Sequence, residues 1–184
     1  KRLVVGLVGF GMRALIPGDI KAEYTPLITA LGGTVWRLGR GHHALNPLDP
    51  GLAAPALAAA VGTQRQQIGE NLRTRTLALL EALLAITSGR SLSATGRRLL
   101  ATALDQTTAT RIGPTIPDIL HALSVGADPL PQIVAADRER DYARAVRGLV
   151  NTLGLLCDGS LRGLFDRPST ITASPYSPSS SGSV

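Results

Sequence analysis

The sequence predicts an α/β protein, a parallel sheet segment that carries a large all-helical insertion. Three observations lead to this prediction. Residues 1–50 contain two short apolar runs around one helical pattern, and residues 51–160 repeat apolar residues at helical spacing. A possible strand at residues 169–173 follows the helices, and we interpret residues 161–172 as a return to the α/β core. Residues 173–184 are rich in Ser and Pro, and we expect them to be disordered.

The elements of the first 50 residues follow from turn signals between apolar runs. Residues 14–16 (Ala-Leu-Ile) precede Pro17-Gly18 and predict a short buried strand that ends in a turn. Residues 24–31 have helical spacing, and Gly32-Gly33 then closes the helix. Residues 34–38 (Thr-Val-Trp-Arg-Leu) predict a second strand, and a loop follows to residue 50.

The central block predicts one helix after another. We expect helices at residues 53–61 and 64–86, then a third that begins after an N-cap at Ser93. Thr115, followed by Pro117 and Asp118 in the first turn, opens a short helix through Leu123. Residues 137–157 form the last predicted helix.

Composition limits the classes of protein. The lone Cys157 excludes an intramolecular disulfide framework and a multi-cysteine zinc site. No stretch reaches the roughly 18 apolar residues of a membrane span, and no signal peptide is expected. The net charge is +6, with an excess of arginine in residues 63–111. A solvated helical face explains this excess most simply, and a surface for phosphates or nucleic acid is the alternative.

Residues 9–14 match the G-x-G-x-x-A pattern of dinucleotide-binding folds after an apolar run. The context differs from that fold, because Pro17-Gly18 comes too soon for the helix that should follow. Asp19 and Glu23 are also too near to reach a ribose. An apolar helix over residues 1–12 is the alternative, and a nucleotide-cofactor oxidoreductase remains the weakest functional reading.

Charged and polar residues follow both predicted strands. Asp19, Lys21 and Glu23 come after the first strand, and Asn46 and Asp49 come after the second. Because the carboxyl ends of parallel strands meet at one sheet edge, these residues would line a ligand site there. A surface turn in which Asp19 caps the next helix is the alternative.

The order of these residues resembles a known family. The run from Ala14 to Tyr24 (ALIPGDIKAEY) resembles the strand–D-x-K-G-E-Y motif of the HerA–FtsK superfamily of ATPases, closest to those of conjugative transfer and type IV secretion. Residues 37–41 (RLGRG), 45–49 (LNPLD) and 163–166 (GLFD) are similar to further segments of that family. In these ATPases an all-helical insertion separates the first segments from the last, so the resemblance implies a RecA-like sheet interrupted by residues 51–160.

The resemblance implies a hexameric motor that uses ATP and Mg²⁺ to move DNA or protein. It implies DNA and secretion-complex proteins as partners, and a cytoplasmic location, free or peripheral at the inner face of the cell membrane. Asp19, Lys21, Glu23, Asn46 and Asp49 would line the nucleotide edge, and Lys21 or Arg40 would contact phosphate or a neighbouring subunit.

The sequence also departs from the family. It contains no P-loop and no Walker B acidic pair, so it supplies no catalytic residue, and we expect no ATP hydrolysis by this chain alone. A non-catalytic helical module that binds a partner or nucleic acid is the main alternative.

Overall fold

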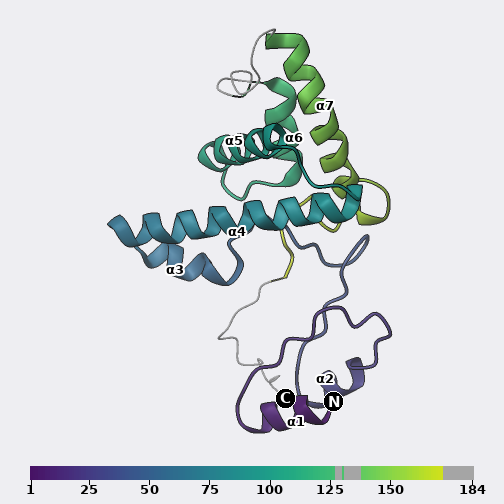
Figure 1. The fold of residues 1–184 in the computed structure, drawn as a ribbon. Helices are drawn as coiled ribbons and strands as arrows, with labels where there is room; N and C mark the ends of the chain where they lie inside the picture. The colour runs from purple at the N-terminus through teal and green to yellow at the C-terminus, as the bar shows by residue number, and fades with distance from the viewer. Residues whose placement is uncertain (127–129, 131–137, 172–184) are drawn as a thin grey trace. The chain divides into compact units, whose positions relative to one another are not determined.

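The computed structural model describes residues 1–126, 130 and 138–171. These residues fall into two compact units (Figure 1). Unit 1 contains Lys1–Arg37, and unit 2 begins at Leu38 and contains the other described residues. The expected disorder of residues 173–184 lies outside the described part of the chain. The division expected at residues 50 and 160 stays a prediction.

The predicted α/β class is wrong. The structure is 62% helix, and no β-strand occurs among the described residues. The predicted strands at 14–16 and 34–38 are irregular, and the only pairing in these segments is an isolated parallel bridge between Leu38 and His43. The expected return to an α/β core at residues 161–172 is also wrong, because residues 162–171 form turns and irregular backbone. A parallel strand needs a neighbour along its whole length, because its backbone groups bond between strands. Neither apolar run has such a neighbour here, so the expected RecA-like sheet is absent from the described residues.

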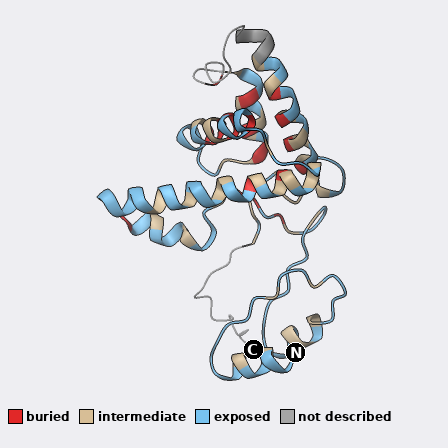
Figure 2. Ribbon diagram, viewed as in Figure 1, coloured by how far each residue is buried: buried red, intermediate tan, exposed pale blue. Residues whose placement is uncertain are grey.

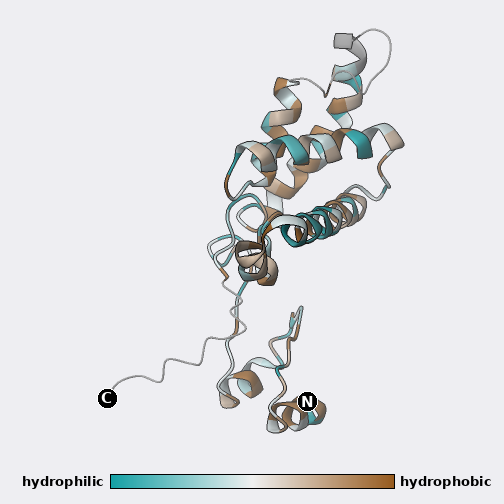
Figure 3. Ribbon diagram, turned by 90° about the vertical axis from the view of Figure 1, so that its left-hand side faces the viewer, coloured by the Kyte–Doolittle hydropathy of each residue, from teal (hydrophilic) through white to brown (hydrophobic). Residues whose placement is uncertain are grey.

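Unit 1 contains two short helices, α1 (Arg2–Gly9) and α2 (Thr25–Ala30). The helical alternative for residues 1–12 is confirmed over Arg2–Gly9, and the helix ends three residues earlier than predicted. The amide of Met12 returns to the Leu7 carbonyl at 2.9 Å, with Gly11 in the left-handed region (φ +77°). Both helices are largely hydrophobic (Figure 3), yet no residue of Lys1–Arg37 is buried. Unit 1 therefore has no core of its own.

Unit 2 is built on four helices: α4 (Gly62–Ser88), α5 (Ala94–Thr110), α6 (Ile116–Val125) and α7 (Arg138–Cys157). Helices α5 and α7 pack on α4, whose buried residues Leu80 and Leu84 lie in its second half, and α6 packs on α5 and α7 (Figures 1 and 2). The short helices η1 (Gly51–Ala53) and α3 (Ala54–Ala59) lie along the first half of α4, which has no buried residue before Leu80. Helix η3 (Gly159–Leu161) follows α7. The predicted helices of the central block are thus confirmed, apart from Asp137, which lies outside the described residues.

The core of unit 2 is aliphatic, as the low aromatic content requires. The pattern that predicted the helix after Ser93 supplies its centre, because Leu99, Leu100, Ala103 and Leu104 are all buried. The other fully enclosed large side chains come from α4, α6 and α7, together with Leu130 between α6 and α7: Leu80, Leu84, Ile116, Ile119, Leu123, Leu130, Leu153 and Leu156.

Helix ends in unit 2 match the sequence signals. The Ser93 side chain accepts a hydrogen bond from the Gly96 amide at 3.0 Å, so the predicted N-cap is confirmed. At α6, Thr115 and Asp118 form a capping box. Helix α6 ends at Gly126, which has a φ of +63°. A Cβ at this position would lie 2.8 Å from the Tyr142 ring, which is too close for any residue other than glycine.

No helix in the described part of the chain is long and apolar enough to cross a membrane.

Candidate functional site

Two segments that flank the helices of unit 2 are joined by backbone hydrogen bonds. The Leu45 amide donates to the Leu164 carbonyl at 2.8 Å, and the Thr170 amide donates to the Ala44 carbonyl at 3.1 Å. The Thr170 hydroxyl in turn accepts from the Ala44 amide at 3.0 Å. We call these segments, residues 42–49 and 163–170, the clasp. The clasp holds together the segment that precedes the helices of unit 2 and the segment that follows them.

Asn46 and Asp49 are the polar centre of the clasp. The Asn46 side chain is only 3% exposed, and its amide nitrogen donates to Asp49 Oδ1 (3.0 Å) and the Pro114 carbonyl (2.8 Å). Its oxygen accepts from the Leu48 amide at 3.1 Å. The second Asp49 oxygen accepts from the Ser169 amide at 3.1 Å, and the Ser169 hydroxyl accepts from the Asn46 amide at 2.8 Å. These partners occupy both side chains, which therefore serve to hold three segments together.

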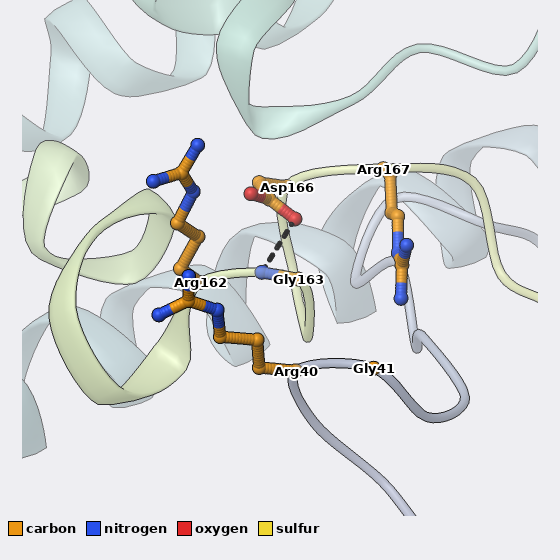
Figure 4. A pocket seen from close by; sticks show the side chains of 6 residues that line it. All are labelled: Arg40, Gly41, Arg162, Gly163, Asp166 and Arg167. Atoms are coloured by element: carbon orange, nitrogen blue, oxygen red, sulfur yellow. Dashed lines mark hydrogen bonds between the residues drawn. The ribbon is translucent and has the colours of Figure 1, made fainter.

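An open pocket of about 300 Å³ lies at one edge of the clasp (Figure 4). Arg40 and Gly41 line it from the first segment, and four residues line it from the second: Arg162, Gly163, Asp166 and Arg167. Every lining residue is charged or a glycine. The pocket therefore offers charged side chains and glycine backbone to a ligand.

None of the three arginines of the pocket, Arg40, Arg162 and Arg167, forms an ion pair with a carboxylate of the described residues, although three ion pairs form elsewhere in unit 2. Asp166 is held within its own turn, because its Oδ1 accepts from the Gly163 amide at 3.0 Å. Arg167 donates from Nη2 to the His42 carbonyl at 3.0 Å, so one guanidinium is also part of the clasp.

Gly163 lies where the two segments of the pocket meet, and its backbone conformation, rather than a lack of space, favours glycine there. A Cβ at this position would lie 3.4 Å from the Arg40 Cα and 3.8 Å from Arg167 Nη2. Its φ of +82° is a conformation that other residues rarely adopt.

The predicted nucleotide-edge residues are divided between the units. Asp19, Lys21 and Glu23 belong to unit 1, whereas Asn46 and Asp49 belong to unit 2. Asp19 accepts from the Glu23 amide (3.0 Å) and the Tyr24 amide (2.9 Å), which agrees with the surface-turn alternative. It does not cap α2, which begins at Thr25 without a side-chain cap. The side chains of Lys21 and Glu23 are exposed. A joint nucleotide edge of all five residues stays a prediction.

The sequence analysis identified Arg40 and missed Arg162 and Arg167. Those two arginines flank residues 163–166, so a basic residue on each side of that turn was the available signal. The sequence does not show that these two arginines lie near Arg40, because more than 120 residues separate them along the chain.

Other chemistry is limited in the described part of the chain. No group of three or more His, Cys, Asp or Glu residues is placed to hold a metal ion there. Burial, with the charges of Asp166 and Asp158, raises the pKa of the Cys157 thiol to about 11, so this cysteine is a poor nucleophile at neutral pH.

Comparison with models of protein families, with curated proteins and with solved structures found no match for this chain.

Proposed function

We propose that this chain is part of an ATP-driven motor of the HerA–FtsK superfamily, of the conjugative-transfer or type IV secretion kind, and that it does not hydrolyse ATP alone. The clasp carries this proposal. Residues 45–49 and 163–166, which resemble family segments on opposite sides of a helical insertion, hydrogen-bond to each other. The chain segments before and after the helical block therefore lie side by side, which is the connectivity of a module inserted into another domain.

The backbone at Ala22 adds support. Ala22 has a φ of +53°, and it is the only non-glycine residue with a positive φ in the described part of the chain. The family motif D-x-K-G-E-Y has glycine at this position. Glycine is favoured there for a physical reason, because an L-residue in the left-handed region costs about 1–2 kcal/mol.

The proposal places catalysis elsewhere in the whole protein. ATP and Mg²⁺ would be held by a P-loop that this chain lacks, and a ring of subunits would act on DNA or on secretion-complex proteins at the cytoplasmic side. Lys21 and Arg40 would contact phosphate or the neighbouring subunit, because cations at such sites balance the charge that develops during phosphoryl transfer.

The complete gene and its product test the motor proposal. We expect the DNA before Lys1 to encode a Gly-x-x-x-x-Gly-Lys-Ser/Thr motif, and the DNA after Val184 to encode an apolar strand that ends in Asp-Glu. In the complete protein, the double variant Asp19→Ser/Lys21→Gln should lose ATP turnover while keeping its helical circular dichroism. Glu70→Gln/Arg75→Gln removes the same two charges from α4 and is the matched control. Wild-type turnover in the Asp19/Lys21 variant would refute the assignment.

A non-catalytic helical module is the second candidate, and the all-helical structure favours it. The core of unit 2 closes without any strand. Its arginine-rich helices are weaker support, since Arg73, Arg97 and Arg111 are committed to ion pairs. A start codon and a stop codon at the boundaries of this chain would favour this candidate over the motor. Nucleic-acid binding by such a module should weaken steeply as salt rises.

The oxidoreductase alternative has lost its basis, because residues 2–9 form helix α1 where the dinucleotide-binding pattern requires a strand.

A further inference from the structure

We propose that the pocket between Arg40 and Arg162 binds a phosphate group, supplied by a nucleotide or by the end of a nucleic acid strand. The inference rests on the pocket alone and does not require that the chain belong to a motor.

The first argument is charge. Three arginines and one aspartate line the pocket, so its formal charge is +3 − 1 = +2. The aspartate forms no ion pair with them and is engaged by the Gly163 amide. Like charges gathered in one depression repel each other, and an anion of charge −2 removes that repulsion.

The second argument is the number and origin of the donors. Arg40 comes from the segment before the helices, and Arg162 and Arg167 come from the segment after them (Figure 4). Each guanidinium presents a planar fork of N–H donors that matches the oxygens of phosphate. Arg167 has one nitrogen on the His42 carbonyl, which fixes the orientation of its fork relative to the first segment.

The pocket has no aromatic residue in its lining. Its six lining residues include no aliphatic side chain either. Recognition of a base requires a stacking surface or an apolar slot. The guanidinium planes of the arginines are the only stacking surface that the lining offers. Its main contribution to binding is therefore charge, which favours the phosphate, and the open shape leaves room for the rest of the ligand in solvent.

The test is titration of the chain with inorganic phosphate, with ADP, and with a short single-stranded oligonucleotide with or without a 5′-phosphate, followed by calorimetry. The pocket variant is Arg40→Gln/Arg162→Gln, which leaves the contact between Arg167 and His42 in place. The matched control is Arg75→Gln/Arg98→Gln, which removes the same charge from exposed arginines on α4 and α5 that have no ion-pair partner among the described residues.

We expect the pocket variant to bind phosphate at least about tenfold more weakly and the control to change less than about twofold, since guanidinium–phosphate bonds are among the strong charged hydrogen bonds. Binding of inorganic phosphate would support a phosphate site without identifying its source; tighter binding of ADP would identify a free nucleotide, and a requirement for the 5′-phosphate would identify a strand end. Equal weakening in both variants, or no binding of any probe up to about 10 mM, the range of very weak complexes, would overturn the proposal. Arg40→Lys, which keeps the charge, should recover part of the affinity and verifies that the pocket variant has not simply misfolded.

Discussion

Units 1 and 2 share the same aliphatic composition but differ completely in burial. Unit 1 exposes Phe10 and Ile20 (86% and 97%) and buries no residue, whereas unit 2 encloses leucines and isoleucines from all of α4–α7. Local propensity suffices to predict the two helices of unit 1, but only packing stabilises a short helix. The difference shows that apolar runs form a buried core in this chain only where the helices α4–α7 pack together.

Truncation of a core side chain should produce the largest difference in stability between the two units. We expect Leu153→Ala to lower the free energy of unfolding of unit 2 by about 2–5 kcal/mol, because the cavity it leaves in the core of unit 2 is not refilled. Leu3→Ala in unit 1 is the matched control, since Leu3 is 74% exposed, and it should change stability by less than about 0.5 kcal/mol. Urea denaturation followed by circular dichroism measures both. Equal losses would mean that Leu3 is as well packed as Leu153.

The clasp should be the next most sensitive feature. Asn46→Ala removes three hydrogen bonds of a buried side chain and leaves Asp49 and Pro114 with unpaired acceptors. We expect a loss of about 2–3 kcal/mol in urea denaturation, the cost of buried groups left unsatisfied. Asn151→Ala, on the exposed surface of α7, should be nearly neutral. If both variants are neutral, the clasp does not hold the ends of unit 2.

The capping box of α6 should make stability depend on pH. Burial alone would raise the pKa of Asp118, but hydrogen bonds from Thr115, with the electrostatic influence of Arg111 and His121, outweigh it, and the pKa is lowered. A carboxyl group with a lowered pKa contributes fully above its ordinary value, 3.8, and loses that contribution as the pH falls through its value in the folded chain.

Asp118→Asn should therefore cost about 1 kcal/mol at pH 7 and flatten the decline in stability below pH 4. Urea denaturation at several pH values measures this, with Glu23→Gln in unit 1 as the control. A variant that keeps the wild-type acid decline would show that other carboxyl groups cause it.

The smallest expected effect is a gain in unit 1. Ala22→Gly relieves the left-handed backbone at φ +53°, which is partly offset by the greater freedom of glycine in the unfolded chain. We expect a net stabilisation of about 0.5–1 kcal/mol, read as slower hydrogen exchange of the Glu23 and Tyr24 amides that bond to Asp19. Ala30→Gly, at the end of α2, should accelerate exchange in that helix instead. Faster exchange in Ala22→Gly would contradict the strain.

The sequence predicted helices well and strands poorly, for one physical reason. Helices α4 to α7 close their own hydrogen bonds, so the spacing of their leucines and the caps at Ser93 and Thr115 were enough to find them. Residues 14–16 and 34–38 have strand-like composition, but a strand exists only beside another, and local sequence does not state whether a neighbour is present.

The candidate site divides in the same way. The sequence by itself determined the helical block, its caps, its aliphatic core and the presence of Arg40 beside two glycines. The tertiary structure alone decided that Asn46 and Asp49 hold Ser169, and that Arg40 meets Arg162 and Arg167 in one pocket. These contacts span more than 110 residues, and they form because the packing of α4–α7 returns the chain to the point at which the helical block begins.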